Sequence, residues 1–547
     1  MKKIYINTGL ILGLFAMLLT SACKEQIDPV VSELEFSRAF IPVGLVAEIS
    51  DVTTVTLNWS EATNTDHYVL EIYQGTVLVP GSVVYTVNIP STTSTQMAFS
   101  YVLPAGDTPF FARLKAVSSK SGVEDSKWTY TEFRTGPENL FTGYQSEMTG
   151  LNSCTVRWKP GSVATALLFV AGANETSYPI TSEELAAGIK MLTGVPTGVY
   201  EIMLMNTTFS RGSTNLIIEG NVMLDSGADL LAAINAASPG DVILLAQGGV
   251  FIFTGNTTIS KSIKIRAVYN ENPPVLAAAT GASTTAPMFL IDAALAPSDS
   301  IVFQNVIMTG FINNDPAGGM ITGVYDQGTS NACNIGTLKF EGCVLSHFSR
   351  QLIRLRGTAS QVINNFIVDD CILFDYGTNS TSYGIISSNT AAATINNIRF
   401  SNSTIYNFLS YLVLYTNAPS CNSIVIDNCT LNEITFTTGS TSRYIIDANN
   451  TVFTAGGGIT ISNSIFGVTA AAHTNGIRAS ATKTFTNSYG TSDFDDTFSP
   501  DYSIKGNLIA YGGLSTGLWT DPVNGVFTFL DAGFAGKATA GAPRWRP

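Results

Sequence analysis

Charged residues are scarce in this chain. They make up only 13% of its 547 residues, and acidic side chains outnumber basic ones, so the formal net charge is −13. An acidic surface repels nucleic acid and anionic membrane surfaces, which excludes both as expected partners. Gly, Ser, Thr and Asn are abundant instead, and this composition favours strands and turns over helices. The length exceeds that of one compact globule and predicts two to four domains.

Cysteine is also sparse, and no CxxC spacing occurs. Three of the seven cysteines share one position of a repeat with two serines: Cys343, Cys371, Cys429, Ser403 and Ser464. We therefore expect small buried side chains at that position, rather than disulfides or a metal site. Cys333 and Cys421 precede two copies of the repeat, and the sequence leaves their pairing open.

The apolar run over residues 10–19 is too short for a stable membrane span. Lys2 and Lys3 precede it, and small residues that end at Cys23 follow it, which is the pattern of a secretory signal. This segment resembles the signal of bacterial lipoproteins. The resemblance implies lipidation of Cys23 and an outer-membrane location, with the protein facing the cell surface. An ordinary signal peptide with an incidental cysteine is the alternative.

One short unit recurs along the C-terminal three hundred residues, with copies that begin at 303, 340, 368, 400, 426 and 461. Each copy has apolar residues two apart and a turn residue that tolerates left-handed backbone. The turn residues are Asn305, Gly342, Asp370, Asn402, Asn428 and Asn463. A unit this short cannot bury its inner face alone, so the copies must stack as a solenoid, with the asparagines about 4.8 Å apart.

This column resembles the asparagine ladder of the right-handed parallel β-helix in the pectate-lyase-like superfamily. Upstream, the strands that end at Trp59 and Trp158 resemble fibronectin type III domains. The predicted fold is all-β: two fibronectin type III-like β-sandwiches followed by a right-handed parallel β-helix. The predicted boundaries are a signal peptide over 1–22, a tether over 23–36, sandwiches over 37–136 and 137–222, the β-helix with its cap helix over 223–497, and a C-terminal cap over 498–547.

The strand that follows each repeat carries the candidate site, because the resembling superfamily has its saccharide groove there. Alternation along these strands places Ile353, Leu355, Leu412, Leu414, Tyr444 and Ile446 inside. The outward residues are Val413 and the glycan-binding candidates Arg354, Arg356, Ser387, Tyr411, Tyr415, Arg443, Asp447 and Arg478. Guanidinium groups match the carboxylate of a uronic acid, and tyrosines offer flat faces to sugar rings. The alternative is a solvated sheet on which Arg354 or Arg356 pairs with Asp375 or Glu341.

Catalytic groups are lacking on this face. Asp447 is its one expected carboxylate, whereas Ca²⁺ takes about six to eight oxygen ligands and a glycosidase needs two carboxyl groups. No cofactor or metal is therefore expected; calcium stays an alternative that the carboxylate count does not support. The sequence identifies no catalytic residue. A lyase that uses Arg354 or Arg356 as its base stays open, although arginine is a poor base.

Two further features have simpler explanations than a site. Glu341, Asp369 and Asp427 form a carboxylate column on the neighbouring sheet, where solvation is the expected role and cation binding the alternative. His473 lies in a loop that would overhang the groove, and a lone loop histidine is expected to be incidental.

The leading functional hypothesis is capture of an acidic, pectin-like polysaccharide without cleavage. The chain is similar to surface lipoproteins of polysaccharide-utilisation systems, which implies partnership with other outer-membrane glycan-uptake proteins and membrane contact only through the lipid. A polysaccharide lyase or glycoside hydrolase is the first alternative. A structural or adhesive surface protein is the second.

Overall fold

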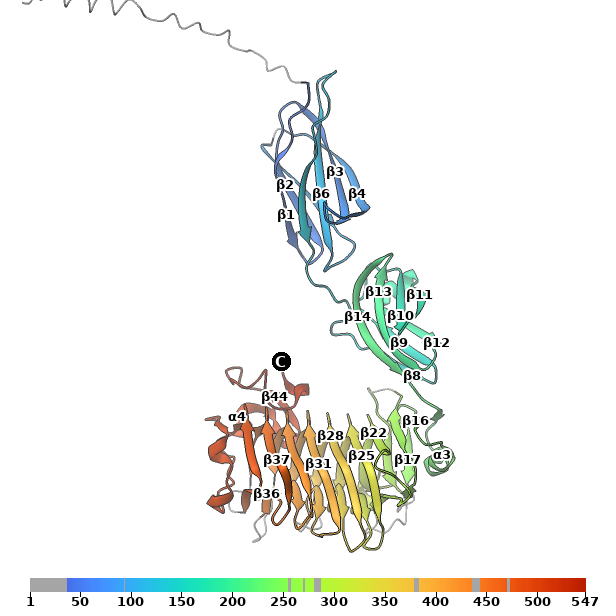
Figure 1. Cartoon of the computed structure of the whole chain (residues 1–547), viewed down its shortest axis with the longest axis vertical. Coiled ribbons are helices and arrows are strands. Elements are labelled where there is room, and N and C mark those ends of the chain that lie inside the picture. Colours follow the sequence, from blue (N-terminus) through green and yellow to red (C-terminus); the bar gives the residue numbers. More distant parts are fainter. Residues whose placement is uncertain are drawn as a thin grey trace, which may run out of the picture. The chain divides into compact units, whose positions relative to one another are not determined.

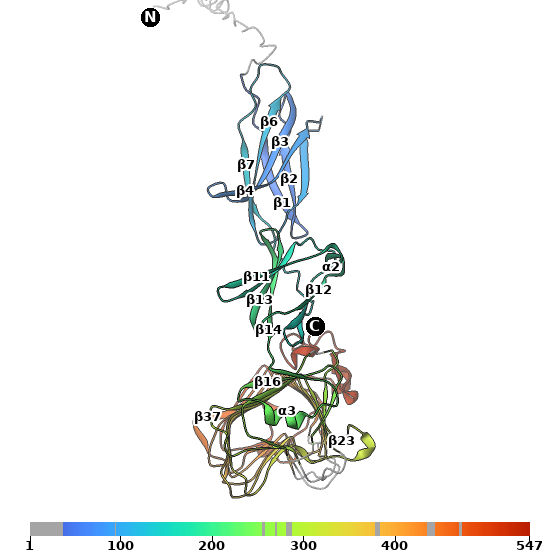
Figure 2. The same cartoon turned by 90° about the vertical axis from the view of Figure 1, so that its right-hand side faces the viewer.

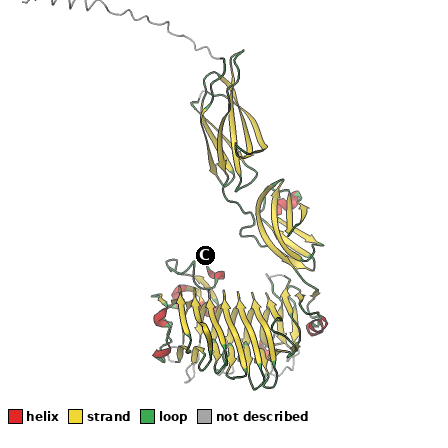
Figure 3. Ribbon diagram, in the orientation of Figure 1, coloured by secondary structure: helices red, strands yellow, loops and turns green. Residues whose placement is uncertain are grey.

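The computed structural model describes residues 37–92, 94–253, 257–268, 271–279, 287–377, 383–434, 443–469 and 473–547. Strands make up most of the described chain, and its helices are short (Figure 3). This confirms the predicted all-β class. Cys23, the signal segment and the tether lie outside the described residues. The chain divides into two compact units, Met1–Leu140 with Leu204–Gly212, and Phe141–Met203 with Ser213–Pro547.

The first fibronectin type III-like sandwich consists of two antiparallel sheets. One contains β1 (Val43–Ser50), β2 (Thr54–Ser60) and β5 (Gln96–Val102). The other contains β4 (Pro80–Pro90), β3 (Thr65–Gly75), β6 (Pro109–Ser118) and β7 (Thr129–Arg134). Alternate residues of β2 point inward, and the Trp59 ring meets Tyr68 edge to face at 5.5 Å between centroids. Burial of two large aromatic rings contributes strongly to such a core.

The second sandwich repeats this plan with shorter strands. One sheet contains β12 (Ile189–Thr193), β9 (Ser153–Arg157) and β8 (Glu147–Gly150). The other contains β11 (Asn174–Pro179), β10 (Ala166–Ala171), β13 (Gly198–Asn206) and β14 (Phe209–Ile218). Trp158 follows β9 and is fully buried, as Trp59 is in the first sandwich. The helix α2 (Ser182–Ala187) begins with a capping box between Thr181 and Glu184.

From β15 onward the chain forms a parallel β-helix with three sheets (Figures 1 and 2). The first sheet contains β15 (Val222–Leu224), β16 (Asp241–Leu245), β19 (Ile263–Ala267), β22 (Ser300–Gln304), β25 (Cys333–Glu341), β28 (Gln361–Asp369), β31 (Ala393–Ser401), β34 (Cys421–Asp427), β37 (Phe453–Ser462) and β40 (Thr482–Thr486). The second contains β17 (Val250–Phe253), β20 (Val275–Ala278), β23 (Ile307–Ile312), β26 (Val344–Phe348), β29 (Ile372–Tyr376), β32 (Thr404–Phe408), β35 (Thr430–Ile434), β38 (Ile465–Phe466), β41 (Tyr489–Gly490) and β42 (Ile509–Ala510). The third contains β18 (Thr257–Ile259), β21 (Pro287–Ile291), β24 (Gly323–Gln327), β27 (Ile353–Leu355), β30 (Ile386–Ser388), β33 (Val413–Tyr415), β36 (Arg443–Asp447) and β39 (Thr474–Arg478).

The bend between the first and second sheets explains the repeated turn residue. The equivalent residues Phe303, Phe340, Val368, Phe400, Ile426 and Ile461 pair strand to strand along the first sheet. Two residues later in each copy, the backbone turns with a positive φ, from 48° at Asn463 to 63° at Gly342. Glycine occupies position 342 because an added Cβ would lie 2.0 Å from Asn305 Oδ1. Asn487 continues the column by one further coil and donates to Asn463 Oδ1 at 2.9 Å.

Directly after this bend, an inward column of Cys and Ser residues satisfies the backbone. The N–H of Cys371 donates to Ser403 Oγ in the next coil at 3.0 Å. The N–H of Cys429 donates in the same way to Ser464 Oγ at 3.1 Å. The small side chain therefore acts as a hydrogen-bond acceptor as well as a filler of space. Cys333 and Cys421, whose pairing was open, are free and buried, and they begin β25 and β34.

Both ends of the β-helix are covered. The helix α3 (Leu230–Ala236) lies across the first coils, where Leu230 and Ile234 join the β-helix core (Figure 2). The C-terminal cap contains α4 (Ser515–Leu518), β43 (Trp519–Asp521) and β44 (Val526–Phe529), with short 3₁₀ turns η2 to η5 at Pro500–Tyr502, Lys505–Asn507, Pro522–Asn524 and Pro543–Trp545. Its aromatic core packs on the outer side of the second sheet around Tyr406 and Ile465. Covered ends prevent pairing with other strands.

Candidate functional site

One column of side chains runs along the outer face of the third sheet. Strand pairing aligns Thr258, Leu290, Asp326, Arg354, Ser387, Leu414, Asp447 and Arg478 in consecutive strands. Four candidates from the sequence, Arg354, Ser387, Asp447 and Arg478, therefore share one line. We call this line the outer column.

The expected direction of several neighbouring side chains is wrong. Tyr415 and Val413, expected outside, are fully buried, whereas Leu414 and Tyr444, expected inside, are partly exposed. The cause is a bulge before each strand, where two consecutive residues, such as Leu352 and Ile353, both point inward. Their N–H groups both donate to one carbonyl, that of Ile385, at 2.9 and 3.0 Å. A bulge adds one residue and so reverses the alternation that follows it.

Tyr415 is consequently a core residue and cannot contact a ligand on this face. Its hydroxyl accepts a hydrogen bond from the Ile395 N–H at 2.6 Å. Ser387 and Arg443 are also more enclosed than expected, with only 5% and 6% of their surface exposed. Tyr411 is partly buried beneath the Arg443 guanidinium, whose Cζ lies 5.5 Å from the ring centroid.

Asp326 is a further candidate residue, which the sequence pattern did not indicate. It lies on β24 and adds a second carboxylate to the outer column. Arg356 Nε donates to Asp326 Oδ1 at 2.8 Å, and Gln351 Nε2 lies 3.3 Å from Oδ2. The expected partners Asp375 and Glu341 are therefore wrong, whereas the solvated sheet with paired arginines stays an alternative. Burial raises the pKa of Asp326, although the neighbouring arginines act in the opposite direction.

Arg350 and Arg354 lie near this ion pair, over the ring of Tyr383. Their guanidinium carbons lie 5.4 and 4.4 Å from the ring centroid of Tyr383. Arg354 Nη1 is 3.9 Å from Asp326 Oδ2, beyond hydrogen-bond distance. Within the described part of the chain, the Arg350 Nε group has no hydrogen-bond partner. We call Arg350, Arg354 and Tyr383 the arginine pair site.

A second ionic cluster lies further along the outer column. Arg478 donates to both carboxylate oxygens of Asp447, at 2.9 and 2.5 Å, and Asp447 is only 2% exposed. The Arg478 Cζ also lies 4.3 Å from the centre of the Tyr444 ring. These hydrogen bonds raise the pKa of Arg478, so it cannot serve as a general base. Asp447 supports Arg478 and is not itself open to a ligand.

The outer column does not provide a catalytic carboxylate pair. Asp326 and Asp447 are separated by four strand spacings, or about 19 Å. Glycosidase carboxyl groups lie no more than about 9.5 Å apart. Among the residues that the structure describes, no group of three or more His, Cys, Asp and Glu is arranged to hold a metal ion.

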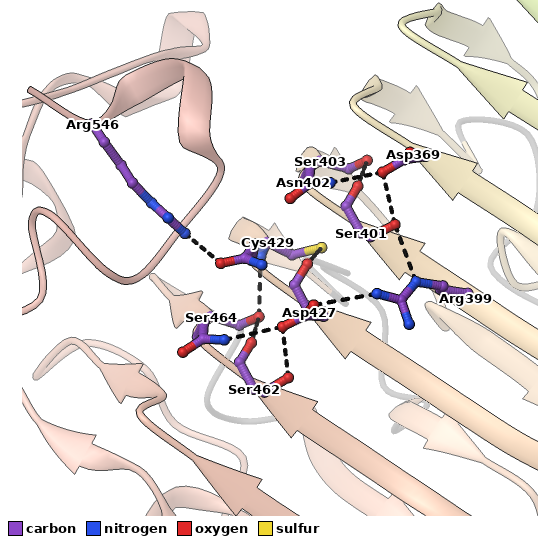
Figure 4. Close-up of polar contacts among 12 residues, drawn as sticks. Asp369, Arg399, Ser401, Asn402, Ser403, Asp427, Cys429, Ser462, Ser464 and Arg546 are labelled. Carbon is purple, nitrogen blue, oxygen red and sulfur yellow. Dashed lines mark hydrogen bonds and ion pairs between the residues drawn. The ribbon is translucent and has the colours of Figure 1, made fainter. Parts of the chain in front are cut away.

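The carboxylates of the first sheet are occupied by structural hydrogen bonds (Figure 4). Asp369 accepts from Ser401 Oγ and Asn402 Nδ2, both at 2.8 Å. Asp427 accepts from Ser462 Oγ at 2.7 Å and from Arg399 at 3.3 Å. Glu341 pairs with Lys339 at 2.8 Å. These contacts fix the turn column, so the carboxylate column is a structural feature.

His473 lies apart from the outer column. Its backbone carbonyl accepts a hydrogen bond from the Arg443 N–H at 2.8 Å.

A polar row on the second sheet was not expected from the sequence. His347, Asp375, Asn407 and Glu433 occupy successive coils, all with positive φ. Asp375 accepts from Asn407 Nδ2 at 2.5 Å and lies 3.2 Å from His347 Nε2. Burial, with a smaller effect of Asp375, raises the pKa of Glu433. The residues of this row directly precede positions such as Tyr376, Phe408 and Ile434. Asp or Asn at such a position indicates left-handed backbone, but His and Glu rarely adopt it, so the sequence indicates only part of the row.

Comparisons with known proteins extend over parts of the chain. A family model described as a domain of unknown function (DUF5123) matches residues 424–545. A two fibronectin type III domain segment from chicken tenascin is 19% identical and aligns with 32% of this chain and 97% of its own length, with a TM-score of 0.19. The FN1–FN3 domains of chicken CNTN1 are 16% identical over 35% of this chain and 73% of theirs, with a TM-score of 0.16. No curated protein matches the sequence.

Within the described ranges, none of the helices has both the length and the apolar character required to cross a membrane.

Proposed function

We propose that this chain is a lipid-anchored protein of the cell surface that binds an acidic polysaccharide on the third sheet without cleaving it. The arginine pair site is the observation that supports this function. Its two guanidinium groups lie over one tyrosine ring, and Arg354 is 3.9 Å from the nearest carboxylate oxygen of Asp326, which leaves its donors for a ligand carboxylate. Arginine recognises carboxylates through two parallel N–H donors.

Charge on this face also favours an acidic ligand. Among the described residues, five arginines and three aspartates lie there, which leaves an excess of positive charge in a chain with a net charge of −13. The basic residues are Arg350, Arg354, Arg356, Arg443 and Arg478, and the acidic ones are Asp292, Asp326 and Asp447. Such local excess steers an anionic ligand to this face and away from the rest of the surface.

Removal of Arg354 tests the function. Arg354→Ala takes one guanidinium from the arginine pair site while Asp326 keeps Arg356 as its partner. We expect binding of oligogalacturonate to weaken about tenfold or more, measured by isothermal titration calorimetry. Arg399→Ala is the matched control, because Arg399 is an arginine of the first sheet paired with Asp427. Equal affinities of the two variants would refute the proposed site, and no binding to any glycan would favour a structural or adhesive protein.

Glycoside hydrolysis is a second candidate, and the polar row of the second sheet favours it. Asp375 and Glu433 lie two strands apart, or about 10 Å, near the separation of carboxyl groups in inverting glycosidases. Glu433, with its raised pKa, suits the general acid, whereas Asp375 accepts a hydrogen bond from Asn407 and lies 3.2 Å from His347 Nε2. Release of reducing ends that disappears in Glu433→Gln but persists in Arg354→Ala would support this candidate.

A further inference from the structure

A hollow lies on the third sheet at the N-terminal end of the outer column. It encloses about 440 Å³, and its floor is formed by Thr258 and Leu290. Its walls come from the loops after two strands, with Asp292 on one side and Ser330 and Asn331 on the other. This volume lies within the range of about 300–1,000 Å³ that is typical of small-ligand sites.

The chemistry of this hollow differs from that of the arginine pair site. None of the described residues that line it is basic, and Asp292 supplies its charge. A ligand carboxylate there would meet a carboxylate and no guanidinium, which is repulsive. Hydroxyl, amide and carboxylate groups around one leucine side chain match a neutral sugar, which presents hydroxyl groups around an apolar ring face.

The hollow and the arginine pair site lie along one line. Leu290 neighbours Asp326 in the sheet, and Asp326 neighbours Arg354. Two to three strand spacings, or about 10–14 Å, therefore separate the floor of the hollow, at Leu290 and Thr258, from Arg354. This distance spans two to three consecutive units of one sugar chain. In an alternating chain, an acidic unit at Arg354 thus has a neutral unit three places away, at Thr258. Asp326, only 4% exposed and bound by Arg356, lies between them without repelling the chain strongly.

We infer that the hollow binds a neutral sugar unit of the same polysaccharide whose acidic unit binds Arg350 and Arg354. The inference rests on the proposed function and makes it narrower: the ligand combines uronic acid with neutral sugars and is not uniformly acidic. Its chain runs along the outer column, with a neutral unit toward Thr258 and an acidic unit toward Tyr383.

Two oligosaccharides of equal length test this inference on the purified chain. One is an oligogalacturonate, and the other alternates galacturonic acid with rhamnose, a neutral deoxy sugar. The variant Thr258→Trp fills the hollow from an exposed strand position, where a large aromatic residue is tolerated. Thr484→Trp, on an exposed position of the first sheet, is the matched control. Asn331→Ala removes an amide from an exposed loop and does not depend on how the tryptophan packs.

We expect the wild-type chain to prefer the alternating oligosaccharide. Thr258→Trp should weaken its binding about tenfold while changing oligogalacturonate binding less than about twofold, and Asn331→Ala should show the same selectivity with a smaller effect. A wild-type preference for oligogalacturonate, or equal losses for both ligands, overturns the inference. The proposed function fails separately if Arg354→Ala leaves both affinities unchanged. In that case, if Thr258→Trp still lowered the affinity for the alternating oligosaccharide alone, the hollow would still be a neutral-sugar site.

Discussion

At the scale of single residues, the inward Cys and Ser column shows how the β-helix tolerates a tight bend. The bend leaves one N–H per coil pointing along the axis, and the next coil supplies an acceptor for it. Cysteine works as well as serine in this role, since Cys371 Sγ accepts from the Cys343 N–H at 3.4 Å. A buried N–H without an acceptor costs about 1–3 kcal/mol.

Ser403→Ala should therefore lower the free energy of unfolding by about 1–3 kcal/mol, because the Cys371 N–H loses its acceptor. Ser403→Cys should cost less, because sulfur already accepts in the same column. Urea denaturation followed by intrinsic fluorescence measures both. If Ala and Cys have the same effect, the column only fills space.

The ion pairs of Glu219 make the stability of the fold depend on pH. Burial alone would raise its pKa, but hydrogen bonds from Lys264 at 2.6 Å and Arg266 at 2.5 Å more than offset burial and lower the pKa below its ordinary value. A lowered carboxyl pKa contributes stability above the unfolded-state pKa, and this contribution is lost as pH falls through the folded-state pKa. Stability should therefore decline on acidification below about pH 4.3. Glu219→Gln should be less stable at neutral pH and show a shallower decline, and an identical decline would contradict the assignment.

At the scale of elements, the two bends of each coil differ in how well the sequence predicts them. The turn column could be recognised because left-handed backbone restricts position 402 and its equivalents to Asn, Asp or Gly. The bulge before the third sheet has no such residue requirement. Strict alternation therefore predicted Tyr415 outside, whereas Tyr415 is fully buried.

The last residues of the chain form an element that no repeat predicts. Arg544 pairs with Asp370 at 2.6 Å, and Trp545 Nε1 donates to Thr404 Oγ1 at 2.7 Å. Arg546 donates to Asn428 Oδ1 at 2.5 Å (Figure 4). This segment thus lies over the turn column of three coils. It also falls almost wholly inside the match to the family of unknown function, residues 424–545.

Truncation after residue 539 should loosen the turn column without altering the third sheet. We expect faster hydrogen exchange at the backbone of Asp370, Thr404 and Asn428, because their contacts with the C-terminal segment are lost. Amides of the first sandwich provide the internal control. Unchanged exchange at the turn column would show that the coils hold this bend without the segment. Oligogalacturonate binding should persist, since the arginine pair site lies on a different sheet.

At the scale of the whole molecule, the proposed function needs the chain to be held at the cell surface, and Cys23 is the residue on which this depends. The six other cysteines are free and buried in the structure. None of these six thiols is therefore open to lipidation in the folded protein, which leaves Cys23 among the cysteines. A single acyl chain binds a membrane only marginally, whereas two or more chains anchor a protein stably. With two or more acyl chains at Cys23, the protein should therefore fractionate with membranes.

Cys23→Ser should abolish incorporation of labelled palmitate and move the protein from the membrane fraction to the soluble fraction. The folded part should be unaffected, because residue 23 precedes the first described residue, 37. Oligogalacturonate affinity of the purified variant should equal that of the wild type, whereas cells that carry it should no longer retain the glycan. If the wild-type chain incorporates no palmitate, the N-terminus is an ordinary signal peptide and the anchoring proposal is wrong, and labelling that persists in Cys23→Ser would mean that the lipid is attached elsewhere. Capture of a glycan at the cell surface would then need another means of attachment. The arginine pair site would still be tested by Arg354→Ala.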